Sequence, residues 1–294
     1  MKTLIADSGS TKTTWCLVER VADEPAFIRP VQTQGLNPLY ASAYDIAAAA
    51  RYVVEQTGER YPDLVQFYGA GCSAGRVVQV EEALRRVFMP TTRIEVASDV
   101  VAACRALGDG ICCILGTGAV AARFLADGSV QTAPSLGYIL GDEGSGAWLG
   151  RQVLADYLKG QMPERTRRLF EEDFGEITAE SAIGHVYQQT FPNRYLASFA
   201  VFIGRHIDHK YCEKLAYDGV EAFFLRNVLR LNPKPGETVS FVGSVAYHLQ
   251  PVLAVVAAMH DLTIGHVLKE PMEGLVRDPL PASPRGGVCP ECKK

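Results

Sequence analysis

Two turns built from small residues are the parts of this sequence best suited to chemistry. The first, Ser8-Gly9-Ser10-Thr11-Lys12-Thr13, follows a short apolar run and a single acid, Asp7. Small residues let backbone N–H groups approach a phosphate closely, hydroxyls add donors, and an acid at a strand end can hold a hydrated Mg²⁺. The second turn, Gly116-Thr117-Gly118, repeats the pattern after another apolar run. Each turn alone could be an ordinary polar hairpin, but two of them favour a pair of phosphate-binding loops.

A third turn, Gly243-Ser244, follows the apolar residues 239–242 and precedes a helical pattern. It could admit a nucleobase beside a helix N-terminus, or it could simply allow close packing of strand and helix. The chain contains neither the GxxxxGK[ST] pattern of a P-loop nor a GxGxxG after a predicted strand. A nucleotide site here would therefore be of another kind.

Three further polar positions are candidates. Asp99 directly follows the predicted strand 93–96 at a predicted helix start, where it is either a general base for a substrate hydroxyl or an acid that complements the helix dipole. Asp142 and Glu143 lie in a glycine-flanked loop that could reach a cleft or remain a solvated turn. Asn37 precedes Pro38 in a predicted loop, where an amide often only holds the loop itself.

The elements that must position these residues follow from hydrophobic periodicity and turn signals. Strands are predicted over 4–6, 14–18, 64–68, 93–96, 111–115, 119–125 and 239–242, and helices over 42–56, 77–88, 98–106, much of 147–231, and from 244 to 259. A strand and hairpin begin near residue 4 and again near residue 111. The sequence therefore predicts an α/β protein of two lobes, 1–108 and 109–294, with the boundary at 107–110. The tail 278–294 is rich in Pro, Gly and Lys and is predicted to be frayed and exposed.

Composition narrows the function classes. The 294 residues are 48% apolar and 21% charged with a net charge of −4, which fits a well-buried core and gives a nucleic-acid partner no electrostatic support. The N-terminus lacks a signal-peptide pattern and no apolar run is long enough to span a membrane, so we expect a cytoplasmic location and no membrane partner. Most of the eight cysteines sit in apolar stretches as free thiols do, and Cys289-Pro-Glu-Cys292 lacks the second pair that a structural zinc site needs.

Taken in order, these motifs resemble the N-acetylglucosamine kinase family, within the BadF/BadG/BcrA/BcrD ATPase group of the actin/hexokinase-like superfamily. The resemblance runs from residue 1 to about residue 274. It rests on Ala6-Asp7-Ser8-Gly9-Ser10-Thr11-Lys12-Thr13, Gly35-Leu36-Asn37-Pro38, Gly69-Ala70-Gly71-Cys72, Ser98-Asp99, Ile114-Leu115-Gly116-Thr117-Gly118, Leu136-Gly137-Tyr138-Ile139-Leu140-Gly141-Asp142-Glu143-Gly144-Ser145, Phe191-Pro192-Asn193-Arg194, Phe241-Val242-Gly243-Ser244 and Pro271-Met272-Glu273-Gly274-Leu275.

The resemblance implies a two-lobed, ribonuclease H-like ATPase fold with a cleft between the lobes, ATP and Mg²⁺ as cofactors, and a homodimer. It implies ATP-dependent phosphorylation of an amino sugar, N-acetylglucosamine to its 6-phosphate as first choice and N-acetylmuramic acid as second. Asp99 would be the catalytic base, and Asp7 would hold Mg²⁺ through water. The residues implied at ATP are Asp7, Gly9, Ser10, Thr11, Lys12, Thr13, Gly116, Thr117, Gly118, Gly243 and Ser244, and those implied at the sugar are Asn37, Asp99, Thr117, Gly137 and Asp142.

The sequence departs from this family beside the expected sugar site. Ala119-Val120 stands where members often carry Ser-Asn, and Ser135-Leu136 stands where animal members have Gly-Trp. Two alternatives stay open. One is an ATPase that activates a partner enzyme, for which Cys112 and Cys113 would be poor ligands of an iron–sulfur cluster because they alternate on a predicted buried strand. The other is a sugar sensor without catalysis.

Overall fold

The computed structural model describes residues 1–9, 11–21, 24–27, 30–72, 74–108, 110–125 and 129–277. The chain divides into two compact units. Unit 1 comprises Met1–Ala106 together with the segment that begins at Pro271, and unit 2 comprises Leu107–Glu270. The sequence assigned everything after residue 108 to the second lobe, whereas the segment from Pro271 belongs to unit 1.

Unit 1 is built on a mixed sheet in the order β3-β2-β1-β5-β6, with β4 also pairing β2. The strands are β1 (Lys2–Ser8), β2 (Lys12–Val21), β3 (Glu24–Phe27), β4 (Val31–Gln34), β5 (Leu64–Gly69) and β6 (Arg93–Ser98). β1 pairs antiparallel with β2 but parallel with β5, and β5 pairs parallel with β6. The carboxyl ends of β1, β5 and β6 therefore lie at one edge of the sheet.

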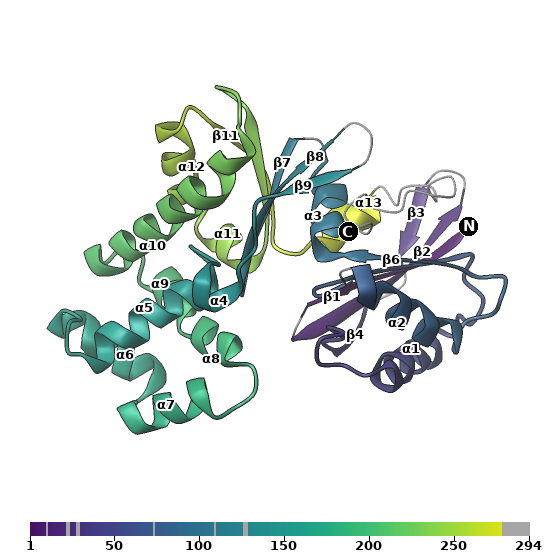
Figure 1. The fold of residues 1–294 in the computed structure, drawn as a ribbon, viewed down its shortest axis with the longest axis horizontal. Helices are drawn as coiled ribbons and strands as arrows, with labels where there is room; N and C mark the ends of the chain where they lie inside the picture. The colour runs from purple at the N-terminus through teal and green to yellow at the C-terminus, as the bar shows by residue number, and fades with distance from the viewer. Residues whose placement is uncertain are drawn as a thin grey trace. The chain divides into compact units, whose positions relative to one another are not determined.

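Both faces of this sheet are covered, because alternate residues of β1 are apolar on either side. Leu4 and Ala6 face a core with α1 (Ala43–Thr57) and α2 (Ala74–Arg85). Ile5 faces a second core with α3 (Asp99–Leu107) and α13 (Met272–Arg277). Figure 1 shows these two helices on the face of the sheet opposite α1 and α2. The α13 side chains Met272, Leu275 and Val276 are buried in that second core, which explains why the segment from Pro271 belongs to unit 1.

Unit 2 carries a sheet in the order β11-β10-β7-β8-β9. Its strands are β7 (Gly110–Leu115), β8 (Ala119–Phe124), β9 (Val130–Thr132), β10 (Thr238–Val242) and β11 (Thr263–Leu268). Its helices are α4 (Gly137–Leu140), α5 (Gly146–Leu158), α6 (Glu164–Phe174), α7 (Ala179–Tyr187), α8 (Pro192–Ser198), α9 (Ala200–Arg205), α10 (Lys210–Phe223), the π-helix η1 (Phe224–Val228), the 3₁₀ turn η2 (Leu229–Leu231), α11 (Ser244–His248) and α12 (Gln250–Met259). One continuous apolar core joins the helices to the inner face of β7, β8 and β10.

The structure differs from the sequence prediction in several elements. Strands β3, β4 and β11 were not predicted, since each is short or half-exposed and lacks a clear alternation of apolar residues. The helix expected from 244 to 259 is two helices, because Pro251 lies at the start of α12 and cannot donate within a continuous helix. The dipeptide Asp127-Gly128, which predicts a hairpin before Val130, and the tail with Cys289 and Cys292 lie outside the described residues. Within the described part of the chain, no helix combines the length and the apolar content that a membrane span requires.

Candidate active site

Three parallel strands of unit 1 end in register. Ser8 of β1 lies opposite Gly69 of β5, which lies opposite Ser98 of β6. Gly9, Ala70 and Asp99 therefore leave the sheet side by side, and the backbone N–H of Ala70 donates to the carbonyl of Ser8 at 2.9 Å. Ligands of α/β proteins bind outside the carboxyl ends of parallel strands, so this edge is the candidate site of unit 1.

A chain of buried hydroxyls supports the first turn. Leu36 N–H donates to Ser8 Oγ at 3.0 Å, Ser8 Oγ lies 2.8 Å from Thr13 Oγ1, and Thr13 Oγ1 donates to the carbonyl of Gln34 at 2.9 Å. Because Thr13 gives its proton to Gln34, the Ser8 hydroxyl must donate to Thr13. Ser8 and Thr13 are both fully buried. The sequence assigned Thr13 to the ATP site, whereas its hydroxyl is committed to the loop 34–36.

The remaining residues of this turn have a different environment. Gly9, Thr11 and Lys12 are exposed at its tip, where Gly9 N–H donates to the carbonyl of Lys12 at 2.9 Å. Asp7, at the end of β1, is half-buried. Ser10 lies outside the described residues. Gly9, Thr11 and Lys12 are therefore the accessible residues of this tip.

Asn37 is buried and held against the turn that follows β5. Its Oδ1 accepts from Leu39 N–H at 2.9 Å. Gly71 has a φ of +78°, and a Cβ there would lie 2.2 Å from Asn37 Oδ1. Only glycine fits this position, since a side chain would be strained and would also displace the amide.

Asp99 is the first residue of α3. Its Oδ1 accepts from Val100 N–H at 3.0 Å, and Ser98 Oγ accepts from Val101 N–H at 3.4 Å. Burial raises the pKa of Asp99, which the backbone hydrogen bonds partly oppose. Burial, helped by the charge of Asp99, also raises the pKa of the Cys72 thiol to about 12, which keeps that thiol protonated. Ser98 thus caps the helix, and Asp99 is a half-buried residue of its first turn.

In unit 2 the turn Gly116–Gly118 rests on the N-terminus of α5. Gly146 N–H donates to the carbonyl of Gly116 at 2.7 Å, and Ala147 N–H to that of Thr117 at 3.1 Å. Nothing lies within 4 Å of the point where a Cβ of Gly116 would be. The helix start therefore fixes the turn while one side of Gly116 stays open.

Asp142 lies directly against this turn. Its Oδ1 accepts from Ala119 N–H at 3.3 Å, and a Cβ on Gly118 would be 3.1 Å from its Oδ2. Asp142 has a φ of +54°, an uncommon conformation that directs the carboxyl toward β8. Burial, then the neighbouring charge of Glu143, raises its pKa. Gly137, the other residue of this segment implied at the sugar, begins α4 with a φ of +70° and is exposed.

The third turn meets the second. β10 pairs parallel with β7, so Gly243 emerges beside Leu115, and a Cβ on Gly243 would lie 2.3 Å from the Leu115 carbonyl oxygen. Gly243 has φ +130° and ψ 155°, a region open essentially only to glycine. Ser244 follows as an exposed residue at the start of α11. The structure thus joins three separate sequence motifs, 116–118, 142 and 243–244, in unit 2.

Glu143 has partners that the sequence did not reveal. Arg226 Nη1 lies 3.2 Å from Glu143 Oε1, and Asn227 Nδ2 donates to Oε2 at 3.3 Å. Both partners lie in η1, more than eighty residues away. No local pattern points to this pairing, and the sequence left open whether Glu143 reaches a cleft or stays in a solvated turn.

The turn of each unit, taken by itself, has groups suited to binding phosphate. In unit 1, Gly9 is exposed and Lys12 carries a positive charge. In unit 2, the side of Gly116 on which a Cβ would lie is open. A carboxylate at a strand end, as in Asp7, is an oxygen donor of the kind that Mg²⁺ prefers, and Mg²⁺ keeps most of its waters. The described residues contain no group of three or more His, Cys, Asp or Glu that could hold a metal ion.

Two α/β units of this kind, with small-residue turns at strand ends, define an actin/hexokinase-like protein, and comparison with solved structures confirms that fold. The putative N-acetylglucosamine kinase from Porphyromonas gingivalis is 42% identical with a TM-score of 0.85, over 94% of this chain and 97% of that one. The chain belongs to the same family as that protein.

More distant structures agree in fold. The putative N-acetylglucosamine kinase from Chromobacterium violaceum has a TM-score of 0.70 at 19% identity, over 94% of this chain and 99% of that one. A ROK family transcriptional regulator, a homologue of the Escherichia coli MLC protein, has a TM-score of 0.56 at 14% identity, over 94% of this chain and 77% of that one. No protein-family model and no curated protein matches the chain, so the narrower BadF/BadG/BcrA/BcrD group stays a prediction.

Proposed function

We propose that this protein is an ATP-dependent sugar kinase that phosphorylates an amino sugar, N-acetylglucosamine, at its 6-hydroxyl. The observation that carries the proposal is the 42% identity to the Porphyromonas gingivalis protein over nearly the whole length of both chains. The named activity of that relative is the source of the substrate, and the residues at the strand ends supply the chemistry that a kinase needs.

In this proposal Asp99 is the general base for the sugar hydroxyl. A base works best when its pKa approaches the working pH, and burial shifts the pKa of Asp99 upward in that direction. Asn37, Thr117, Gly137 and Asp142 are the proposed sugar contacts. Asn37 suits the role because Gly71 and Leu39 N–H already hold its amide, so little ordering remains to be done on binding.

Asp7, Gly9, Thr11 and Lys12 are the proposed contacts of ATP in unit 1, together with Ser10. Gly116–Gly118, Gly243 and Ser244 are those in unit 2. Thr13 is reassigned as a positioning residue, because its hydroxyl is committed to Gln34. Mg²⁺, with Asp7 as its proposed protein ligand, would neutralise phosphate charge when bound, while the residues of the protein position the sugar hydroxyl and accept its proton.

A sugar panel tests the proposal. The purified protein is assayed for conversion of ATP to ADP with N-acetylglucosamine, N-acetylmuramic acid, glucose and no sugar, and the phosphorylated product is located by NMR. We expect the highest kcat/KM with N-acetylglucosamine and a 6-phosphate product. ATP hydrolysis that is equally fast without sugar would instead support the ATPase-activator alternative, and sugar binding without any turnover would support the sensor.

N-acetylmuramic acid is the second candidate because of Ala119-Val120. The backbone N–H of Ala119 donates to Asp142, and the half-buried Val120 side chain has no polar group to offer. A sugar hydroxyl that meets an amide in other members of the family would lose that hydrogen bond here, which is worth roughly 1 kcal/mol. A preference for N-acetylmuramic acid in the panel, against our expectation, would show that this lost hydrogen bond decides the choice of sugar.

A further inference from the structure

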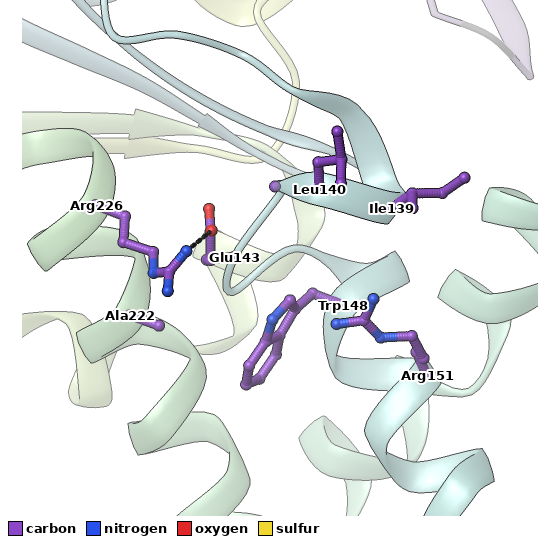
Figure 2. Close-up of a pocket in the computed structure, with 8 residues that line it drawn as sticks. Ile139, Leu140, Glu143, Trp148, Arg151, Ala222 and Arg226 are labelled. Atoms are coloured by element: carbon purple, nitrogen blue, oxygen red, sulfur yellow. Dashed lines mark hydrogen bonds and ion pairs between the residues drawn. The ribbon is translucent and has the colours of Figure 1, made fainter.

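Unit 2 contains a cavity of about 320 Å³ that none of the proposed ATP contacts lines. Figure 2 shows the residues around it, from α4, α5, α10 and η1. They are Ile139, Leu140, Gly141, Glu143, Trp148, Arg151, Ala222 and Arg226. The volume lies within the range of small-molecule sites, which combine apolar and aromatic walls with a few polar groups.

The cavity lies behind the loop that carries Asp142. Neighbouring carboxyls of this loop point in different directions: Asp142 toward Gly118 and Ala119, and Glu143 toward η1. Asp142 itself does not line the cavity, whereas Gly141 and Glu143 on either side of it do. The loop Gly141–Glu143 thus lines the cavity with Gly141 and Glu143, while its central residue Asp142, the proposed sugar contact, points away from the cavity.

Two local features fix the walls. A Cβ on Gly144 would lie 2.6 Å from the Gly219 carbonyl oxygen, and one on Gly219 would lie 3.2 Å from the Trp148 ring, so α5 and α10 approach closely there and hold the indole. α10 then continues as the π-helix η1, and its consecutive residues Arg226 and Asn227 donate to opposite oxygens of Glu143. Short π-helical segments are rare and frequently occur at functional sites.

The lining groups divide the cavity into three chemical regions. Arg151 forms no ion pair with any described residue, so its guanidinium is available to an anion. Trp148 lies between the two arginines in the view of Figure 2 and offers a flat apolar surface. The pair Glu143–Arg226 offers both acceptors and donors at the other side, and Ile139 and Leu140 are 68% and 71% exposed at the rim.

We propose that this cavity is a second ligand site, which binds a phosphorylated sugar and acts on the reaction through the Gly141–Glu143 loop. Arg151 binds the phosphate, because arginine matches phosphate geometry and stays charged. Trp148 packs on the ring of the sugar, and Glu143 and Arg226 bind its hydroxyls. A ligand that draws Arg226 from Glu143 shifts the backbone beside Asp142, because the two acids are adjacent in this loop. The choice of a sugar phosphate rests on the proposed function, since it is the product class of that reaction.

Tryptophan fluorescence tests binding without any enzymatic assay. The chain has two tryptophans, and Trp15 is buried in unit 1, so the Trp15→Phe variant leaves Trp148 as the only tryptophan. In that background the emission is followed during titration with N-acetylglucosamine 6-phosphate. Arg151→Gln is the test variant, Arg151→Lys retains the charge, and Arg168→Gln is the control, since Arg168 is an exposed arginine of α6 that pairs with Glu164.

We expect a saturable change in emission whose midpoint rises at least tenfold in Arg151→Gln, less in Arg151→Lys and not at all in Arg168→Gln. As N-acetylglucosamine is raised, the midpoint should reach a limiting value and not rise without bound, since the sugar occupies the other side of the loop and both ligands can be bound together. In steady-state assays the sugar phosphate should inhibit wild type without competing with sugar, and inhibition should weaken in Arg151→Gln.

Four results would overturn the inference: a midpoint that Arg151→Gln does not change while thermal unfolding shows an intact fold, an equal loss in Arg168→Gln, displacement by N-acetylglucosamine, or an equal response to inorganic phosphate alone. Binding at Trp148 in a protein without kinase activity would refute only the proposed function. Kinase activity without binding at Trp148 would refute only the second site.

Discussion

Replacing Thr13 by valine separates a structural role from a ligand role in the first turn. Valine keeps the branched shape and replaces only the hydroxyl by a methyl group. In the structure that hydroxyl accepts from Ser8 and donates to the Gln34 carbonyl in a fully buried position. The variant therefore leaves the buried Ser8 hydroxyl proton without its partner, while the Gln34 carbonyl keeps the hydrogen bond from Thr33 Oγ1 at 3.4 Å and the exposed residues at the tip of the turn are unchanged.

The expected cost follows from this network. A buried polar group left without its partner costs about 1–3 kcal/mol. The added methyl group, itself buried, returns up to about 0.8 kcal/mol. We expect a net loss of about 1–2 kcal/mol in the free energy of unfolding of unit 1. Thr13→Ser, which restores the hydroxyl, should recover most of it.

Urea unfolding measures this loss. In a Trp148→Phe background the remaining tryptophan, Trp15, is buried two residues from Thr13 and reports on unit 1. ATP affinity is measured in parallel by calorimetry. Thr13→Val should lower stability and change ATP affinity by less than threefold. Thr11→Val should leave the stability unchanged and lower the affinity for ATP, since Thr11 is exposed at the tip of the turn. Unchanged stability with a large loss of ATP affinity in Thr13→Val would refute the structural assignment.

Three other changes have distinct expected outcomes. Asp99→Asn should lower turnover by about 10²–10⁴-fold while ATP affinity is kept, and wild-type turnover should fall at a higher pH than an ordinary aspartate would give, because the base form is lost as pH falls through a raised pKa. Because the pKa of Asp99 is raised, the folded state binds this proton more tightly than the unfolded state does. The added free energy of unfolding is fully present below the pKa of Asp99 in the unfolded state and is lost as pH rises through its pKa in the folded state. Urea unfolding of Asp99→Asn should therefore lack this pH dependence. Gly71→Ala should displace Asn37 and lower the stability of the fold by about 1–3 kcal/mol through strain. It should raise the KM for the sugar by a larger factor than the KM for ATP, and equal increases in both would contradict the sugar contact. A chain that stops at Glu270 loses the buried side chains of α13 and should lose several kcal/mol of unit 1 stability in urea, on the order of 2 kcal/mol per side chain, whereas a chain that stops at Arg277 should keep it.

Much of the site was predictable because its parts are local. An apolar strand followed by small residues and an acid indicates a turn at a sheet edge, and Ser98 followed by Asp99 indicates a capped helix start; both are confirmed in the structure. The α/β class and the actin/hexokinase-like fold are confirmed as well. The roles of the site residues in binding and catalysis remain predictions.

Other features depend on partners that are distant in the chain. Whether Thr13 faces a ligand or the protein depends on the loop 34–36, which contacts it only after β4 pairs with β2. The ion pair of Glu143 and Arg226, and with it the cavity at Trp148, depends on the approach of α5 to α10 through two glycines.

The sequence by itself determined the class of fold, the positions of the turns and the type of group that each turn offers, because backbone propensity and hydrophobic alternation act over a few residues. The tertiary structure alone decided which of these groups are buried in hydrogen bonds and which are exposed to a ligand. It also decided that α13 belongs to unit 1, since Met272, Leu275 and Val276 bury apolar surface against strands near the other end of the chain. Long-range burial of this kind leaves no local pattern, because the partners become neighbours only when the sheet has formed.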